Sequence, residues 1–155
     1  MLYQETGLKK VLGWREWALL PGLGLPPIKA KVDTGARSSC LHAFETQMFT
    51  QDGQPWVRFG IHPHQEDRDT ECFCEAPIAD ERPVTDSGGH TESRLVIVSR
   101  VVLGHWSDDI EITLSNRDTM RFRMLLGRTA LVKGGFRVDP ATSYLMGRAQ
   151  ELENI

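Results

Sequence analysis

Apolar and polar residues alternate in short runs along most of this 155-residue chain, and Gly, Pro, Asn or Asp interrupts nearly every run. Alternation places the apolar side chains on one face of a β-strand. Helix signals are scarce, and only residues 129–132 are expected to form a short helical turn. Several short strands at regular spacing predict an all-β fold, a closed barrel with a single lobe per chain. The main expected strands are 13–20, 28–32, 41–44, 56–61, 94–103, 109–114, 120–124 and 136–139. Of these, 109–114 and 120–124 are expected to pair as a hairpin.

The bulk composition is that of an ordinary globular domain, with 40% hydrophobic and 25% charged residues. We expect a lead-in over residues 1–12, one domain over 13–147 and a tail over 148–155. A net charge of −3 gives no reason to expect nucleic acid or an anionic membrane as a partner. No apolar run is long enough for a membrane span, and the N-terminus lacks signal-peptide features. The three cysteines do not form the disulfide framework that is typical of a small secreted protein. A cytoplasmic protein is therefore expected.

One strand leads directly into a candidate catalytic motif. Ile28, Ala30 and Val32 share one strand face, and Asp33-Thr34-Gly35 follows at once. Gly35 lets the chain turn sharply after the strand. The strand end would therefore fix the position of Asp33 while its carboxylate stays accessible. Alone, the motif also fits an Asp that merely caps a turn. Aspartic peptidases use such a corner, with two carboxylates sharing a proton around a water.

A second segment makes the motif more specific. Leu125-Leu126-Gly127-Arg128 follows about ninety positions after Asp33, and the two segments together resemble the retropepsin-like aspartic peptidases. The fuller pattern is similar to the bacterial family labelled "ATP-dependent zinc protease", also called RimB-like, over roughly residues 13–147. The strings that carry this resemblance are Ala30–Ala36, Ser38-Ser39, Leu41-His42-Ala43, Leu114–Met120 and Met124–Arg128.

The resemblance implies an aspartic endopeptidase with Asp33 as its catalytic residue. Thr34 and Gly35 would orient the carboxylate, Ala36 would keep the turn compact, and Ser38 could bond to the turn. His42 is a candidate substrate-binding residue, although a lone strand His is usually structural.

Basic residues and the end of the second segment complete the predicted site. Arg94 and Arg117 match basic positions of the family pattern and could recognise a carboxylate, although each could equally be an exposed edge residue. Leu126, Gly127 and Arg128 would be structural neighbours of the site, because in retropepsins the corresponding Arg belongs to an interface.

The shared-proton mechanism implies a homodimer. Asp33 is the only Asp of an Asp-Thr-Gly or Asp-Ser-Gly that directly follows an apolar strand, because Asp86-Ser87-Gly88 lies in a polar stretch. A two-fold axis through the site would supply the second Asp33.

The implied substrate is a glutamate-rich or polyglutamylated tail, trimmed by hydrolysis. Members of the resembled family are associated with an ATP-grasp ligase that adds glutamates to the C-terminus of a small-subunit ribosomal protein. Residues 94–148 hold nine basic and five acidic residues, whereas residues 66–92 hold nine acidic and two basic residues. The excess of basic residues in the second half of the chain is consistent with binding of an acidic substrate there.

The polar stretch around residues 62–93 leaves two interpretations open. It is either a flap beside the site or a solvated surface excursion. Its His62, His64, Cys72 and Cys74 are the only candidates for the zinc of the family label, but the spacing is not a standard zinc pattern. We therefore expect no cofactor and no metal ligand.

Two rival functions remain open. One is a non-catalytic module that binds an acidic peptide or the ribosome, and the other is a metal-dependent hydrolase that uses the four His and Cys residues of the polar stretch.

Overall fold

The computed structural model describes residues 10–116 and 121–147. Strands dominate, and the two helical segments are the 3₁₀ helix η1, Pro21–Leu23, and α2, Arg128–Gly134. The strands are β1 Val11–Leu12, β2 Arg15–Ala18, β3 Ile28–Val32, β4 Ser39–His42, β5 Phe44–Gln51, β6 Gln54–Ile61, β7 Cys72–Pro77, β8 Asp80–Thr85, β9 Thr91–Leu103, β10 Trp106–Ser115, β11 Met124–Leu126 and β12 Arg137–Val138. The predicted all-β class and the short helical turn are confirmed.

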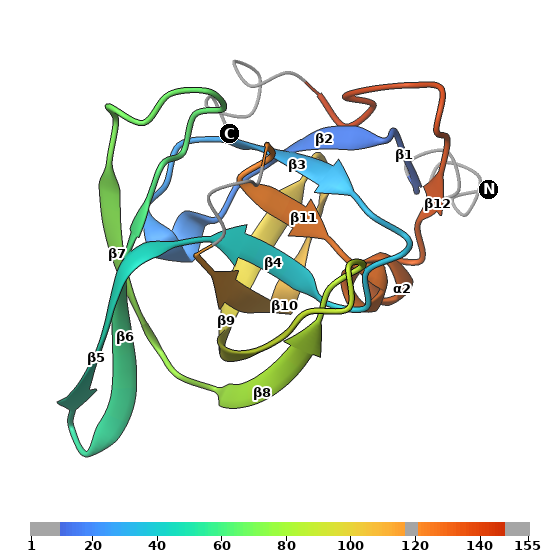
Figure 1. Cartoon of the computed structure of the whole chain (residues 1–155). Coiled ribbons are helices and arrows are strands. Elements are labelled where there is room, and N and C mark those ends of the chain that lie inside the picture. Colours follow the sequence, from blue (N-terminus) through green and yellow to red (C-terminus); the bar gives the residue numbers. More distant parts are fainter. Residues whose placement is uncertain (1–9, 117–120, 148–155) are drawn as a thin grey trace.

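Seven strands form the main sheet in the order β2-β3-β11-β4-β10-β9-β8 (Figure 1). Within it, β11 runs parallel to β3 and antiparallel to β4, and β4 runs parallel to β10. A second sheet, β5-β6-β7, projects from one side, and β1 pairs with β12. The parallel pairing of β3 with β11 brings the end of the Asp33 strand beside the Leu126-Gly127-Arg128 segment.

The main sheet does not close into a barrel in the part of the chain that the structure describes, so this prediction is wrong. Strands β2 and β8 are its edges, and among the described residues the one β-bridge between the segment after β2 and β9 is Leu19–Val102. The two backbone hydrogen bonds of this bridge are 3.1 and 2.9 Å long. Closure fails because β2 has four residues and the chain turns into η1 soon after it, leaving too little strand to pair along β9.

The expected hairpin of residues 109–114 with 120–124 is also wrong. Strand β4 lies between β10 and β11 and pairs with both. All four residues of β4 are buried, as are Met124 and Leu126 of β11. Buried strands need hydrogen-bond partners on both edges, and the observed order gives β4 and β11 two neighbours each. Residue 120 lies outside the described residues.

Two further strand pairs are hairpins. Strands β5 and β6 pair through a turn at Asp52 and Gly53, whose φ angles of 53° and 75° are typical of a tight hairpin turn. Strands β9 and β10 pair through Gly104, whose φ angle is 59°.

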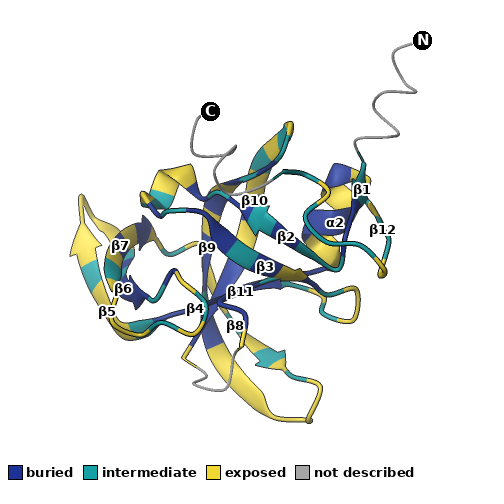
Figure 2. Cartoon of the chain, turned by 90° about the horizontal axis from the view of Figure 1, so that it is seen from above, coloured by how far each residue is buried: buried dark blue, intermediate teal, exposed yellow. Residues whose placement is uncertain are grey.

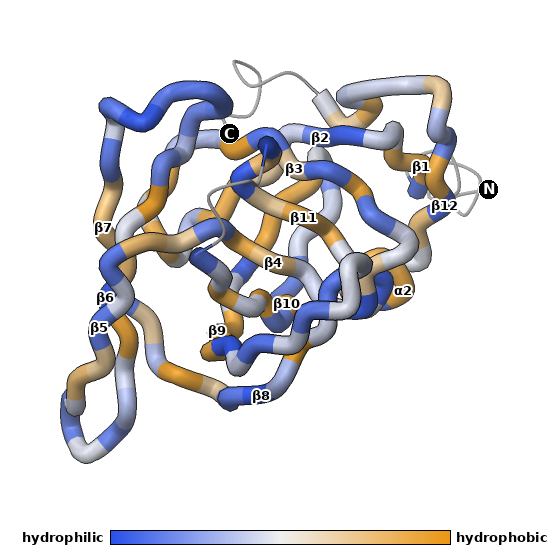
Figure 3. The backbone as a smooth tube through the Cα atoms, viewed as in Figure 1, coloured by the Kyte–Doolittle hydropathy of each residue, from blue (hydrophilic) through white to orange (hydrophobic). Residues whose placement is uncertain are grey.

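One core unites the two sheets. Apolar residues of β3, β4, β10 and β11 pack with Val57, Phe59 and Ile61 of β6 in a single buried cluster. Figure 2 shows the central strands buried and much of β5 and the β8–β9 turn exposed, and Figure 3 shows the apolar residues concentrated on the central strands. No helix in the described ranges is long and apolar enough to span a membrane.

The polar stretch of residues 62–93 contains regular structure. It holds β7, β8 and the start of β9, and both β7 and β8 are edge strands. Strand β8 pairs with β9 from Asp80↔Val96 to Thr85↔Thr91, so part of the stretch is an antiparallel hairpin at the edge of the main sheet.

Candidate active site

Asp33 stands at the corner where β3 ends. Its backbone N–H donates to the carbonyl of Leu126 at 2.9 Å, which fixes the corner to β11. Its side chain is half-buried, and Oδ1 accepts a hydrogen bond of 2.9 Å from the backbone N–H of Gly35. The Ala36 N–H donates to the Asp33 carbonyl at 3.2 Å and closes the turn. One carboxylate oxygen is therefore held by the turn.

The start of α2 holds the loop that follows Asp33. The backbone N–H groups of Arg128 and Thr129 donate to the carbonyls of Ala36 and Arg37 at 2.8 and 3.0 Å. The Arg128 side chain donates from Nη1 to the Thr34 carbonyl at 3.0 Å.

Gly127 brings this second segment very close to the loop. Its N–H donates to Ser39 Oγ at 3.1 Å, and a Cβ at this position would lie 2.5 Å from the carbonyl carbon of Ser38. Only glycine permits this approach.

A cleft of about 980 Å³ opens beside Asp33, and we call it the Asp33 cleft. Most of its lining residues belong to the loop after β3 and to β8 with its following turn. In Figure 1 these two segments run near α2. Its lining residues are Asp33, Gly35, Ala36, Arg37, Ser38, Cys40, Asp80, Arg82, Pro83, Val84, Thr85, Asp86, Ser87, Arg94, Glu111, Leu125 and Arg128.

An ion-pair group ties the β8 wall to the sheet. The Arg82 guanidinium makes a two-pronged contact with Glu111 of β10, with bonds of 3.0 and 3.1 Å. Its Nε contacts Asp80 at 2.9 Å. The hydrogen bond from Arg82, followed by that from the Glu81 N–H, lowers the pKa of Asp80 from its ordinary value. The same contacts with Glu111 and Asp80 raise the pKa of Arg82.

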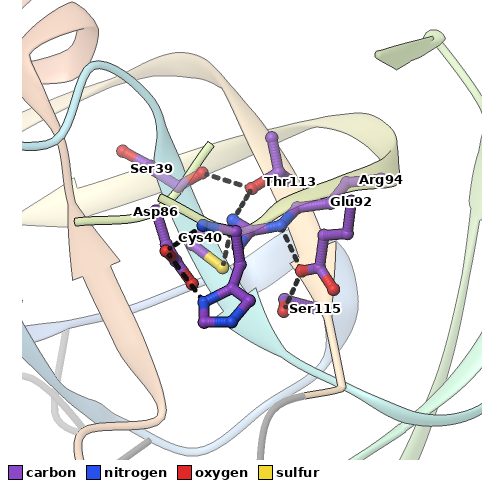
Figure 4. Close-up of polar contacts among 8 residues, drawn as sticks. Ser39, Cys40, Asp86, Glu92, Arg94, Thr113 and Ser115 are labelled. Carbon is purple, nitrogen blue, oxygen red and sulfur yellow. Dashed lines mark hydrogen bonds and ion pairs between the residues drawn. The ribbon is translucent and has the colours of Figure 1, made fainter. Parts of the chain in front are cut away.

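Arg94 lies at the base of the cleft in a buried polar group (Figure 4). Its Nε donates to Glu92 at 2.6 Å, and Ser115 Oγ donates to the same carboxylate oxygen at 2.7 Å. Its Nη1 lies 3.6 Å from Cys40 Sγ and 3.4 Å from Thr113 Oγ1. The charge of Arg94 is therefore paired within the protein.

The structure gathers most of the predicted site residues. Asp33, Gly35, Ala36, Ser38 and Arg94 all line the Asp33 cleft, as does Arg128 from the second segment. Thr34 is exposed next to Asp33, and Leu126 and Gly127 are buried beneath the loop.

Of the predicted substrate-binding residues that the structure describes, His42 does not line the Asp33 cleft. His42 is 3% exposed, and its ring lies 6.4 Å from that of His62. Arg117 falls outside the described residues, so its role stays a prediction.

Sequence reasoning missed the cleft residues that β8 and β10 supply. Asp80 and Arg82 alternate on β8, and Glu111 lies on β10. Their only signal in the sequence was charge alternating along a short strand, which is also typical of a solvated edge.

The His and Cys residues of the polar stretch do not form a metal centre. Among the described residues, no group of three or more His, Cys, Asp or Glu side chains could hold a metal ion. His62 stacks on Phe44 at 4.3 Å, and Cys74 Sγ contacts the Leu23 carbonyl at 3.5 Å. Burial, and secondarily Cys72, raises the pKa of the Cys74 thiol to about 11.

A family model described as "Retropepsin-like aspartic endopeptidase RimB" matches residues 11–149. This chain belongs to the RimB-like family. The family description carries no zinc label, and the label "ATP-dependent zinc protease" is not supported for the RimB-like chain.

Curated relatives of this RimB-like chain are named after a different activity. It is 48% identical over 147 residues to a "Probable alpha-L-glutamate ligase" of Parasynechococcus marenigrum, covering 94% of this chain and 31% of that protein. It is 43% identical over 145 residues to a protein of the same name from Shewanella pealeana, again covering 94% and 31%. The chain thus spans less than a third of the length of these relatives.

A solved structure shares the fold. A Legionella pneumophila protein of unknown function aligns with a TM-score of 0.74 and 27% identity, covering 88% of this chain and 97% of that one. The match shows that the two chains share a fold over most of their lengths.

Proposed function

We propose that this chain is an aspartic-type peptidase whose catalytic carboxylate is Asp33. The observation that carries the proposal is the Asp33 corner, where a half-buried carboxylate is oriented by the Gly35 N–H at 2.9 Å and opens into a cleft of about 980 Å³. Membership of a family described as retropepsin-like aspartic endopeptidases supports the same chemistry.

The proposed reaction is hydrolysis of a peptide bond. Asp33 and a second carboxylate share one proton, the ionised member takes a proton from a bound water, and the water oxygen attacks the peptide carbonyl. The protonated member donates to the carbonyl oxygen, and the tetrahedral intermediate then collapses with protonation of the leaving amine. We assign the second carboxylate to Asp33 of a second copy of the chain.

The proposed substrate is a glutamate-rich protein tail, such as a ribosomal protein C-terminus extended by a glutamate ligase. The names of the curated relatives, "Probable alpha-L-glutamate ligase", support this substrate class because a chain similar to ours forms part of those proteins. The proposed reaction would then remove or shorten the glutamate tail that a ligase adds. We propose that it takes place in the cytoplasm and needs no metal ion.

The test is mass spectrometry of a glutamate-tailed peptide incubated with the wild-type protein, with Asp33→Asn, and with Asp52→Asn as a matched control in the distant β5–β6 turn. We expect glutamate-sized losses with wild type and Asp52→Asn, at least about 10³-fold slower loss with Asp33→Asn, and no effect of a chelator. Cleavage that persists in Asp33→Asn, or that a chelator abolishes, would contradict the aspartic mechanism. Binding without any cleavage by wild type would favour the non-catalytic module.

A further inference from the structure

The outward face of β2 and β3 carries a cationic surface outside the Asp33 cleft. Burial alternates along both strands, so Arg15 and Trp17 of β2 share this face with Lys29 and Lys31 of β3. The register pairs Arg15 with Lys31 and Trp17 with Lys29. None of the four lines the Asp33 cleft. The two strands lie side by side at the β2 edge of the main sheet (Figure 1), and we call the four residues the β2–β3 face.

The three cations of the β2–β3 face have no acid to pair with. Among the described residues, no ion pair includes Arg15, Lys29 or Lys31. Glu16, the one acid of the two strands, is buried on the opposite face and accepts the N–H of Gly13 at 2.7 Å. Like charges directly opposite on neighbouring strands are destabilising. The Arg15–Lys31 pair therefore indicates an anionic ligand.

Aromatic rings lie between the cations. The Arg15 guanidinium lies 4.6 Å from the centroid of the Trp14 ring and 5.0 Å from that of Tyr144. The Tyr144 ring stacks on Trp17 with the centroids 5.8 Å apart. Lys29 Nζ lies 5.5 Å from the centroid of the Trp17 ring. Three half-buried rings and two cations thus form one continuous stack on the surface.

A backbone conformation that bulky residues avoid holds the Tyr144 ring in this stack. Its φ angle is 56°, in the left-handed region. The Tyr144 N–H donates to the Arg15 carbonyl at 3.0 Å, and Arg15 Nε donates to Ser143 Oγ at 3.1 Å. Such outliers persist where the surrounding structure holds them, and they cluster at functional sites. The ring is therefore positioned against β2 before any ligand binds.

A single-stranded nucleic acid matches both the charge and the rings of this surface. Its phosphates pair with Lys and Arg, and its bases stack on aromatic side chains. A glutamate tail offers carboxylates to the cations but has no ring that could stack on Trp17 or Tyr144. The net charge of −3 for the whole chain does not reveal this local excess of cations.

We propose that the β2–β3 face, with Trp14 and Tyr144, binds single-stranded RNA. The three cations contact phosphates, and Lys29 leaves the Trp17 ring for a phosphate, which frees that ring face for a base. The choice of RNA over DNA rests on the proposed ribosomal substrate. Lys31 lies two residues before Asp33, about 7 Å along the strand, so bound RNA would keep a tail on the same particle near the cleft.

The charge contribution can be measured by fluorescence anisotropy of a labelled single-stranded RNA of about 10 nucleotides. We expect Lys29→Gln to weaken binding about 3-fold or more and to reduce the slope of log K against log salt by about 0.7, the value for one lost phosphate contact. Lys133→Gln is the control, because this half-exposed lysine lies on α2 and pairs with Asp108 at 3.5 Å. It should change the affinity less than about 2-fold. No binding by wild type, or equal effects of the two substitutions, would overturn the proposal.

The stacking contribution needs a variant that removes a ring. We expect Trp17→Leu to weaken RNA binding about 5-fold or more, and Trp56→Leu, a half-buried tryptophan of β6, to change it less than about 2-fold. Trp17→Phe keeps a ring and should lose less affinity than Trp17→Leu. Circular dichroism would verify the fold of each variant, and the Lys29→Gln result still decides the proposal if Trp17→Leu does not fold. Unchanged binding by folded Trp17→Leu would overturn the stacking.

Competition experiments identify the class of ligand. An oligoglutamate peptide of the same formal charge should displace the labelled RNA much more weakly than unlabelled RNA does. Equally strong displacement would assign the β2–β3 face to an acidic peptide. Tighter binding of single-stranded DNA of the same sequence would assign it to DNA. Either outcome overturns the proposal.

Failure of this inference and failure of the peptidase proposal are distinguishable, because RNA binding should be the same in wild type and in Asp33→Asn. If wild type binds RNA through Lys29 and Trp17 but cleaves no glutamate-tailed peptide, the RNA surface stands and the peptidase is wrong. If cleavage depends on Asp33 but no RNA binds, the peptidase stands and the RNA surface is wrong.

Discussion

Gly127 is the residue whose side-chain size decides whether the Asp33 loop can close. A Cβ at this position would lie 2.5 Å from both the carbon and the oxygen of the Ser38 carbonyl and 2.9 Å from the Ser39 nitrogen. These contacts are to backbone, which cannot rotate away. The approach also makes the 3.1 Å bond from the Gly127 N–H to Ser39 Oγ possible.

We therefore expect Gly127→Ala to lower the free energy of unfolding by about 1–3 kcal/mol, the usual cost of overpacking. Urea denaturation would measure this loss. Gly22→Ala is the control, because the nearest atom to its new Cβ would be Ser99 Oγ at 4.0 Å, and its effect should be small. Equal stability of the two variants would contradict the close-approach argument.

Strand β8 lines the cleft, and its ladder with β9 and the Arg82–Glu111 ion pair to β10 hold it in place. Asp80 and Glu111 flank Arg82, and both acids are about half exposed. Arg82 lowers the pKa of Asp80 below its ordinary value of 3.8. The contribution of the ionised Asp80 to the free energy of unfolding is therefore fully present above pH 3.8. This contribution is lost as the pH falls through the lowered pKa. Acid therefore removes the Asp80–Arg82 ion pair, which lies within β8.

We predict that Arg82→Gln raises the pKa of Asp80 toward its ordinary value. The measurement is an NMR titration of the carboxyl groups. Asp67 provides an internal control, because its lowered pKa arises first from the Asp69 N–H and then from the Thr70 hydroxyl, neither of which involves Arg82. A pKa of Asp80 that does not move in the variant would show that Arg82 does not contact Asp80 in solution.

The whole molecule offers one Asp-Thr-Gly corner, so the proposed dyad needs a second copy of the chain. Peptidase activity per chain should then fall on dilution below the dimer dissociation constant. Adding a large excess of Asp33→Asn chains at fixed wild-type concentration should suppress activity, because most wild-type chains would sit in mixed dimers. An excess of Asp52→Asn, whose change lies in the β5–β6 turn, should not.

Sedimentation at the assay concentrations would check that the dimer forms. Activity that is independent of dilution and of added Asp33→Asn would contradict the dimer. The chain's own Asp86 lines the same cleft and would then be the next carboxylate to substitute.

The sequence alone predicted the local features that depend on neighbours along the chain. Alternation located strands such as β3, β6 and β10. Asp33-Thr34-Gly35 after an apolar strand identified the candidate catalytic corner, because strand, turn and carboxylate are contiguous. The later Leu126-Gly127-Arg128 segment was recognised only through its resemblance to a family.

Tertiary structure decided what depends on partners far apart in the sequence. The placement of β4 between β10 and β11 replaced the predicted hairpin, since buried strands require two hydrogen-bonded neighbours and the sequence does not say which. The open sheet and the Arg82 group on the cleft wall were unpredictable for the same reason. Alternation in the sequence determines on which face of its strand a side chain lies. Only the packing of the sheet determines which residues that face contacts.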